Sequence, residues 1–187
     1  MRIILIRHGQ TVANKDGVWE GHGEGELTEK GIEQAKKLGE FLKNEKIDYA
    51  YSSDLKRAKD TAKYVLKFHK DVPIEYTKLL REAFLGVIEG KKDIIVDWSN
   101  PPENAELFDS LIRRAKEFVE IIKDKEYSTI LVFGHGGINK AIISVFRGQE
   151  DFPHDFEQDN TCFNILEITD KGEMKVIKIN STEHLKS

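Results

Sequence analysis

Short apolar runs alternate along this chain with stretches in which apolar residues recur every three or four positions. The runs predict buried strands, and the longer spacing predicts amphipathic helices. We expect strands at residues 3–6, 47–51, 74–76, 129–133, 162–168 and 174–179, and helices at about 28–44, 52–66, 106–123 and 137–145. Strand and helix alternation of this kind predicts a three-layer α/β/α sandwich with a mostly parallel central sheet. The turn at residues 170–172 predicts an antiparallel edge near the C-terminus.

Polar residues next to these elements predict where helices and loops begin. Thr28 is expected to cap the first long helix, and Ser52 or Ser53 is expected to cap the second. The glycine-rich stretch from Gly21 to Gly25 lacks the spacing of a dinucleotide-binding loop, so we expect a mobile substrate loop there.

Composition indicates one globular domain covering residues 1–187. The chain has 187 residues, of which 39% are hydrophobic, and this length fits a single domain with a real core. With 33 acidic and 29 basic side chains the net charge is -4, which argues against nucleic acid or an anionic membrane as a partner. Apolar runs are too short for a membrane span or a signal sequence, so the expected location is cytoplasmic.

Several reactive or aromatic side chains are expected to be structural. Cys162 is the single cysteine and lies in a predicted strand, which favours a buried thiol over a nucleophile. Trp19 and Trp98 are expected to anchor loops or the core. Four histidines lack ligand spacing and are expected at the surface, the first also being a candidate for the pocket wall: His22, His69, His154 and His184.

Two histidines directly follow predicted core strands. Arg7 and His8 come after the run at residues 3–6, and His135 follows the run at residues 129–133. In parallel sheets, ligands bind outside the carboxyl ends of the strands, so these side chains are expected at one site. Taken alone, His8 is open to three interpretations, namely a metal ligand, an anion clamp or a nucleophile.

Arg57 is expected at the same edge. It lies in the first turn of the helix that follows the strand at residues 47–51, although a solvated surface arginine would be the ordinary interpretation. Two arginines and two histidines around one point suit a phosphoryl group, because guanidinium groups match its oxygens and no metal is then needed.

With these residues assembled, the chain resembles the histidine phosphatase superfamily, which contains cofactor-dependent phosphoglycerate mutases and many small phosphomonoesterases. The resemblance extends over nearly the whole chain in five ordered blocks. These are Leu5-Ile6-Arg7-His8-Gly9-Gln10-Thr11 with Asn14, Leu27-Thr28 with Gly31 and Gln34-Ala35, Ser52-Ser53-Asp54-Leu55-Lys56-Arg57-Ala58 with Thr61-Ala62, Leu80-Arg81-Glu82 with Gly86 and Gly90, and Gly134-His135-Gly136-Gly137.

The resemblance implies a phosphoglycerate mutase-like fold and a metal-independent phosphatase without a cofactor. It implies that His8 is the nucleophile that forms a phosphohistidine and that Glu82 is the general acid. That nucleophile must be a neutral imidazole whose second nitrogen is held by a hydrogen bond, often to a backbone carbonyl. The residues implied to bind the substrate phosphate are Arg7, Asn14, Arg57 and His135, the last as a cation when phosphate is bound.

Hydrolysis of a small phosphorylated metabolite is favoured over two alternatives. The family's mutases tend to be longer, and the stretch from Gly21 to Leu27 departs from their usual pattern. In the segment that follows Glu82, Lys91 and Lys92 are the only nearby basic residues, which provides little cationic grip for a bisphosphate. A non-catalytic phosphate-binding module is the other alternative, but every implied catalytic position is filled. A small phosphomonoester is thus the expected partner of a monomer or homodimer.

Overall fold

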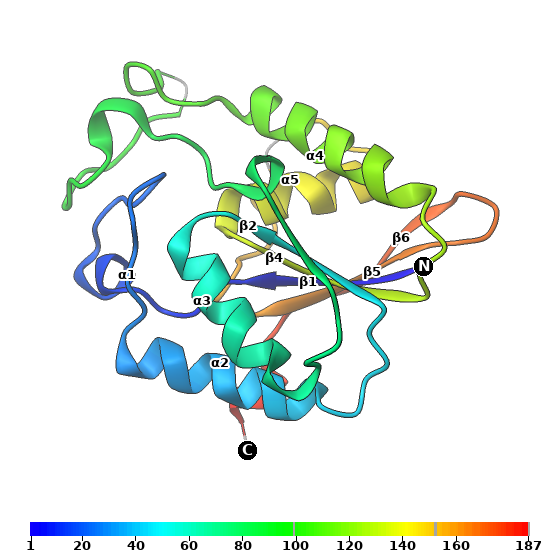
Figure 1. Cartoon of the computed structure of the whole chain (residues 1–187). Coiled ribbons are helices and arrows are strands. Elements are labelled where there is room, and N and C mark those ends of the chain that lie inside the picture. Colours follow the sequence, from blue (N-terminus) through cyan, green and yellow to red (C-terminus); the bar gives the residue numbers. More distant parts are fainter. Residues whose placement is uncertain (99, 152, 187) are drawn as a thin grey trace.

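The computed structural model of this chain describes residues 1–98, 100–151 and 153–186. One six-stranded sheet with the order β3-β2-β4-β1-β5-β6 runs through the centre (Figure 1). Its strands are β1 (Arg2–Arg7), β2 (Tyr49–Ser53), β3 (Ile74–Thr77), β4 (Thr129–Gly134), β5 (Phe163–Ile168) and β6 (Met174–Ser181). The helices are α1 (Val12–Asp16), α2 (Glu29–Leu42), α3 (Lys56–Val65), α4 (Phe108–Lys123) and α5 (Gly136–Arg147).

Four neighbouring strands of this sheet are parallel. β1 and β2 both pair in parallel with β4, and β3 pairs in parallel with β2, whereas β5 and β6 form the antiparallel side. The expected mostly parallel sheet with an antiparallel C-terminal edge is therefore confirmed. In the β1–β4 register Arg7 lies opposite Gly134, so His8 and His135 leave the sheet as neighbours.

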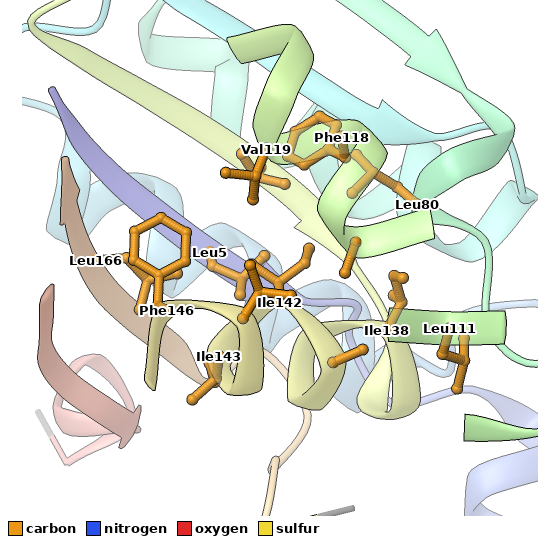
Figure 2. Close-up of a cluster of buried hydrophobic side chains, with 14 of the residues drawn as sticks. Leu5, Leu80, Leu111, Phe118, Val119, Ile138, Ile142, Ile143, Phe146 and Leu166 are labelled. Carbon is orange, nitrogen blue, oxygen red and sulfur yellow. The ribbon is translucent and has the colours of Figure 1, made fainter. Parts of the chain in front are cut away.

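Helices cover both faces of the sheet, as the three-layer prediction requires. The apolar sides of α2 and α3 pack on one face against Ile4, Ile6 and Phe133. On the other face, α4 and α5 pack against Leu5 and Leu166 (Figure 2). Alternate residues of β1 thus enter opposite cores, which is the period-two pattern of a central strand. Because β1 is packed on both faces, its C-terminal end, which leads into His8, is held in a fixed position.

The expected start of α3 is wrong. β2 continues through Ser52 and Ser53, and α3 begins only at Lys56. Leu55 is the N-cap and makes no side-chain capping bond, whereas Thr28 caps α2 as expected. Both serines are buried at the strand end, where their hydroxyls bond within the turn, so neither is placed to cap the helix.

Two further features differ from the sequence analysis. The short helix α1 was not expected, because its five residues are too few and too polar to show an apolar stripe. Thr11 and Asn14 form its capping box. His184 was expected at the surface but is only 2% exposed, because the last turn of the chain packs beside α2 and accommodates this ring near Phe163.

Candidate active site

His8 lies just beyond β1 in a defined tautomer. Its Nδ1 donates to the carbonyl of Gly9 at 2.8 Å, and its Nε2 accepts from Nε of Arg57 at 3.3 Å. The lone pair on Nε2 therefore faces the cavity-lining arginine, while Nδ1 carries the proton. The neighbouring backbone is fixed as well, because the amide of Gly9 donates to Thr61 Oγ1 and the carbonyl of His8 accepts from the amide of Thr161.

The structure brings the two arginines to the same place. Arg57 is almost fully buried, and its terminal nitrogens donate to the carbonyls of Gly21 at 2.7 Å and Gly23 at 3.0 Å. Arg7 is the last residue of β1 and donates through one terminal nitrogen to the carbonyl of Gln158. Its Nε is buried without a partner in the described structure. An oxyanion entering here would therefore find a donor without a partner.

His135 completes this group from the end of β4. Its ring lies 5.1 Å from the His8 ring, measured between centroids, and is fully buried. Both ring nitrogens lack a partner among the described residues. A buried polar group without a partner is costly, and it is most easily explained as a binding position.

Both histidines are held neutral by their surroundings. Burial lowers the pKa of His8 well below its ordinary value, and the charges of Arg57 and Arg7 lower it further. Burial also lowers the pKa of His135, with Arg57 next in importance. A neutral His8 is what nucleophilic attack needs. The cationic state of His135 stays a prediction for the phosphate-bound enzyme.

Glu82 reaches the site from the irregular segment between β3 and α4. Its carboxyl oxygens accept from the amide of Gly137 at 3.0 and 3.1 Å, at the start of α5. The segment itself is fixed by Arg114 of α4, whose guanidinium donates to the carbonyls of Leu79, Arg81 and Glu82. A carboxyl group that lines the cavity is thus held at the N-terminus of α5.

Asn14 lies on the third position of α1, and its side chain lines the same cavity. Its amide oxygen accepts from the backbone amide of Thr11 at 3.3 Å and from Nδ2 of Asn160 at 3.0 Å. Since both bonds use the oxygen, the NH2 group of Asn14 is oriented as a donor. All six residues singled out in the sequence therefore lie around one place: five line the cavity, and the ring of His135 lies beside that of His8.

A cavity of about 640 Å³ opens in front of these groups. Beyond the predicted site residues its wall is largely apolar, and the main contributors are Trp19, Leu85, Trp98, Leu107, Phe108 and Leu111. Both tryptophans therefore line the cavity as well as anchoring loops. Trp98 and Leu107 are about half exposed at its mouth.

Some residues of the site could not be found in the sequence. Glu20 lies beside Arg57 in the cavity wall, and Gln158 and Asn160 support the site from the loop before β5. Only long-range packing brings them here, and polar residues in loops give no local signal. His22, the weak candidate, contacts the carbonyl of Glu82 through Nε2 at 2.9 Å.

Cys162 takes no part in this chemistry. Its thiol is fully buried, and burial raises its pKa to about 12. Within the described residues, no cluster of histidine, cysteine or carboxylate side chains is arranged to hold a metal ion. No helix of the described structure combines the length and apolar character needed to cross a membrane.

A sequence profile of the histidine phosphatase superfamily (branch 1) matches residues 3–182. The chain belongs to this superfamily. It is 33% identical to the adenosylcobalamin/alpha-ribazole phosphatase of Escherichia coli, over 91% of this chain and 92% of that protein. It is 29% identical to a broad-specificity phosphatase of Saccharomyces cerevisiae, over 99% of this chain and 87% of that one.

A solved structure shows the same architecture. Phosphoserine phosphatase from Entamoeba histolytica, in complex with 3-phosphoglyceric acid, superposes with a TM-score of 0.86 at 26% identity and covers 98% of both chains. This histidine phosphatase is therefore a phosphoric monoester hydrolase that acts on small phosphorylated metabolites. Both the phosphatase interpretation and the family resemblance made from the sequence are confirmed.

Proposed function

We propose that His8 is the nucleophile of this phosphatase. Nε2 attacks the phosphorus of the bound ester, so that a P–N bond forms while the bond to the ester oxygen breaks. The observation that carries this proposal is the fixed tautomer of His8, with Nδ1 bound to Gly9 and Nε2 carrying a lone pair. Water then attacks the phosphohistidine and releases inorganic phosphate and free His8.

The groups around His8 form the proposed phosphate cage, which we define as Arg7, Asn14, Arg57 and His135. Arg57 lies against the attacking nitrogen, and Arg7 has a buried donor without a partner among the described residues. Charge on the transferring phosphoryl oxygens is stabilised by donors that are already in place, which lowers the barrier without reorganisation. The partnerless ring of His135 supports its assignment to the same cage.

Glu82 is proposed to move the proton. In its protonated form the carboxyl group donates its proton to the departing ester oxygen. The resulting carboxylate takes a proton from the attacking water in the second step. Its position at Gly137 supports this role, because that amide is available to stabilise the carboxylate between the two steps.

The proposed chemistry uses no metal ion. With EDTA present, the enzyme should still release inorganic phosphate from p-nitrophenyl phosphate, whereas His8→Ala should lose at least about a thousandfold in kcat. Activity that disappears on chelation, or that survives in His8→Ala, would refute the assignment. A mutase is tested in parallel by following the interconversion of the two phosphoglycerates with a bisphosphate primer.

The cavity wall favours one class among the substrates named for the relatives. The relatives include enzymes named for alpha-ribazole phosphate and for phosphoserine. Beyond the phosphate cage, the described lining is mainly apolar and aromatic, its acidic members include Glu106 and Asp109, and it contains no lysine. A carboxylate on the substrate would meet Asp109 there with no lysine to balance it, whereas Glu106 is already paired with Arg114. We therefore propose an ester whose alcohol part is bulky, ring-containing and free of acidic groups.

Matched esters test this preference. We expect kcat/KM to be higher for naphthyl phosphate than for phenyl phosphate, and higher for phosphoethanolamine than for phosphoserine. Trp98→Ala should cost about tenfold with the naphthyl ester and less with small esters. The exposed Ile177 of β6 supplies the control Ile177→Ala. Equal losses on all esters would reject the aromatic wall as a determinant of specificity.

A further inference from the structure

Glu20 is a buried carboxylate inside the wall of the catalytic cavity. It lies in the loop after α1, and its side chain is only 9% exposed. Oε2 accepts from the hydroxyl of Thr11 at 3.0 Å and lies 3.4 Å from Nε of Arg57. The same Nε contacts Nε2 of His8. An anionic side chain therefore lies against the same arginine nitrogen that contacts the proposed nucleophile.

The second oxygen of Glu20, Oε1, is buried and has no hydrogen-bond partner among the described residues. It lies so close to Gly25 that a Cβ there would approach within 2.3 Å, so the glycine is what leaves room for the carboxyl group. A buried carboxylate normally has both oxygens satisfied, since each missing bond has a desolvation cost. The arrangement therefore suits a carboxyl group that changes its protonation state.

The charges around Glu20 make ionisation sensitive to a bound anion. Arg57 from α3 and Arg7 from β1 favour the carboxylate, as does the bond from Thr11, whereas Glu82 disfavours it. Burial is the largest effect, and it raises the pKa of Glu20 above the usual value. A phosphoryl dianion bound to the same arginines would repel the carboxylate and offset their attraction.

We propose that Glu20 takes up a proton from solvent when a tetrahedral dianion enters the cage, so that the enzyme selects phosphoryl groups by coupling their binding to protonation of this carboxyl. The neutral acid no longer repels the anion, and its O–H becomes a donor. Glu20 is thus a residue that determines affinity for the phosphoryl group, in addition to the residues that transfer it. This inference rests on the proposed phosphate cage.

Sulfate is the appropriate probe, because it is a tetrahedral dianion that does not itself titrate near neutral pH. Calorimetric titrations in buffers of different ionisation enthalpy give the number of protons taken up per sulfate bound. Over about pH 5.5 to 8 we expect wild-type enzyme to take up at least about one proton at maximum, and Glu20→Gln to take up about one fewer. Affinity for sulfate should then fall less steeply with pH in Glu20→Gln.

Two controls separate this effect from a structural one. Glu24 lies in the same loop with its side chain exposed, so Glu24→Gln should match the wild type. Glu20→Ala removes the carboxyl group without placing an amide in the pocket and should behave like Glu20→Gln. Equal proton uptake by wild type and either Glu20 variant would overturn the proposal, and so would an uptake near zero in the wild type.

The same experiment distinguishes failure of the cage from failure of the inference. If sulfate binds and competes with substrate but proton uptake does not depend on Glu20, only the role of Glu20 is wrong. If sulfate does not compete with substrate in the wild type, the phosphate cage itself is wrong, and with it the role of Glu20.

Discussion

His8 owes its chemical form to its immediate neighbours. The carbonyl of Gly9 holds the proton on Nδ1, and Arg57 faces the lone pair on Nε2. Burial and the two arginines favour the neutral ring, because an imidazolium here would be desolvated and repelled by like charge. The residues around His8, the proposed nucleophile, therefore hold its ring neutral before any substrate binds.

The low pKa of His8 predicts that its ring stays neutral under mildly acidic conditions. In nitrogen-15 NMR titrations of the empty enzyme, the His8 ring should stay neutral from about pH 7.5 down to pH 5.5, through the range in which a free histidine becomes charged. Arg57→Gln removes one source of repulsion and should move the His8 pKa upward. A His8 ring that charges near pH 6.5 in the wild type, or a downward shift in Arg57→Gln, would contradict this electrostatic account.

The six candidate site residues, which the structure brings together, could be predicted from the sequence because each stands in a recognisable block or directly after a strand. The positions of Glu20 and His184 had no such signal. Glu20 is one of many charged residues in a loop, and only the fold places it against Arg57. His184 is buried because of contacts with Thr161 and Phe163, both distant in sequence. Burial of single polar residues depends on packing that local patterns do not encode.

The join between β1 and α2 depends on a very close backbone approach. Gly31, in the first turn of α2, lies against the backbone of Gln10, and a Cβ on it would lie 2.1 Å from the Gln10 carbonyl oxygen. That carbonyl also accepts from the amide of Thr28, the cap of α2. The helix start and the segment carrying His8 are therefore fixed to each other.

Gly31→Ala should reverse the usual effect of such a change. Replacing glycine by alanine within a helix normally stabilises it. Here the new methyl group would displace Gln10, so we expect the free energy of unfolding to fall by about 1–3 kcal/mol and kcat to fall with it.

Denaturant unfolding and steady-state kinetics measure both effects. Lys30→Ala, at the exposed position just before, is the matched control and should stay within about 0.5 kcal/mol of the wild type. A Gly31→Ala enzyme as stable and active as the wild type would show that the close approach does not position the catalytic loop.

Long elements were predictable from the chain, and their ends were less so. The stripes of α2, α4 and α5 are long enough for a 3.6-residue period to be seen, and their faces pack as expected. α3 begins late because β2 extends through two serines that are buried in the site region. α1 depends on a capping box rather than on apolar burial, so hydrophobic periodicity could not reveal it.

The whole fold brings together residues that are far apart along the chain. β4 lies between β1 and β2, so the ends of all three strands meet on the side where the loop after α1 and the segment before α4 lie (Figure 1). The cavity lining as a result includes Arg7, His8, Asn14, Glu20, Arg57 and Glu82, and the ring of His135 lies 5.1 Å from that of His8. The alternation of strands and helices predicted the three layers and the edge of the sheet at which the site lies. The shape of the cavity depends on the loop after α1 and the segment before α4, and neither has a periodic sequence signal.

We propose that the chain folds as one domain, which thermal unfolding followed by two spectroscopic probes can test. Trp19 and Trp98 report on the cavity, while circular dichroism reports on the helices of both layers. We expect thermal transitions by the two probes to coincide, and added sulfate to raise both midpoints together. An earlier tryptophan transition would indicate that the cavity segments unfold independently of the sheet.

The covalent role of His8 can be tested directly by trapping the phosphoenzyme. Wild-type enzyme mixed with a phosphorus-32-labelled phosphomonoester and quenched in milliseconds to seconds should carry label that is stable in alkali and lost in acid, as a phosphohistidine is. His8→Ala should carry none, although its fold is intact by circular dichroism. Label retained by His8→Ala, or label in the wild type that is stable in acid, would contradict the mechanism.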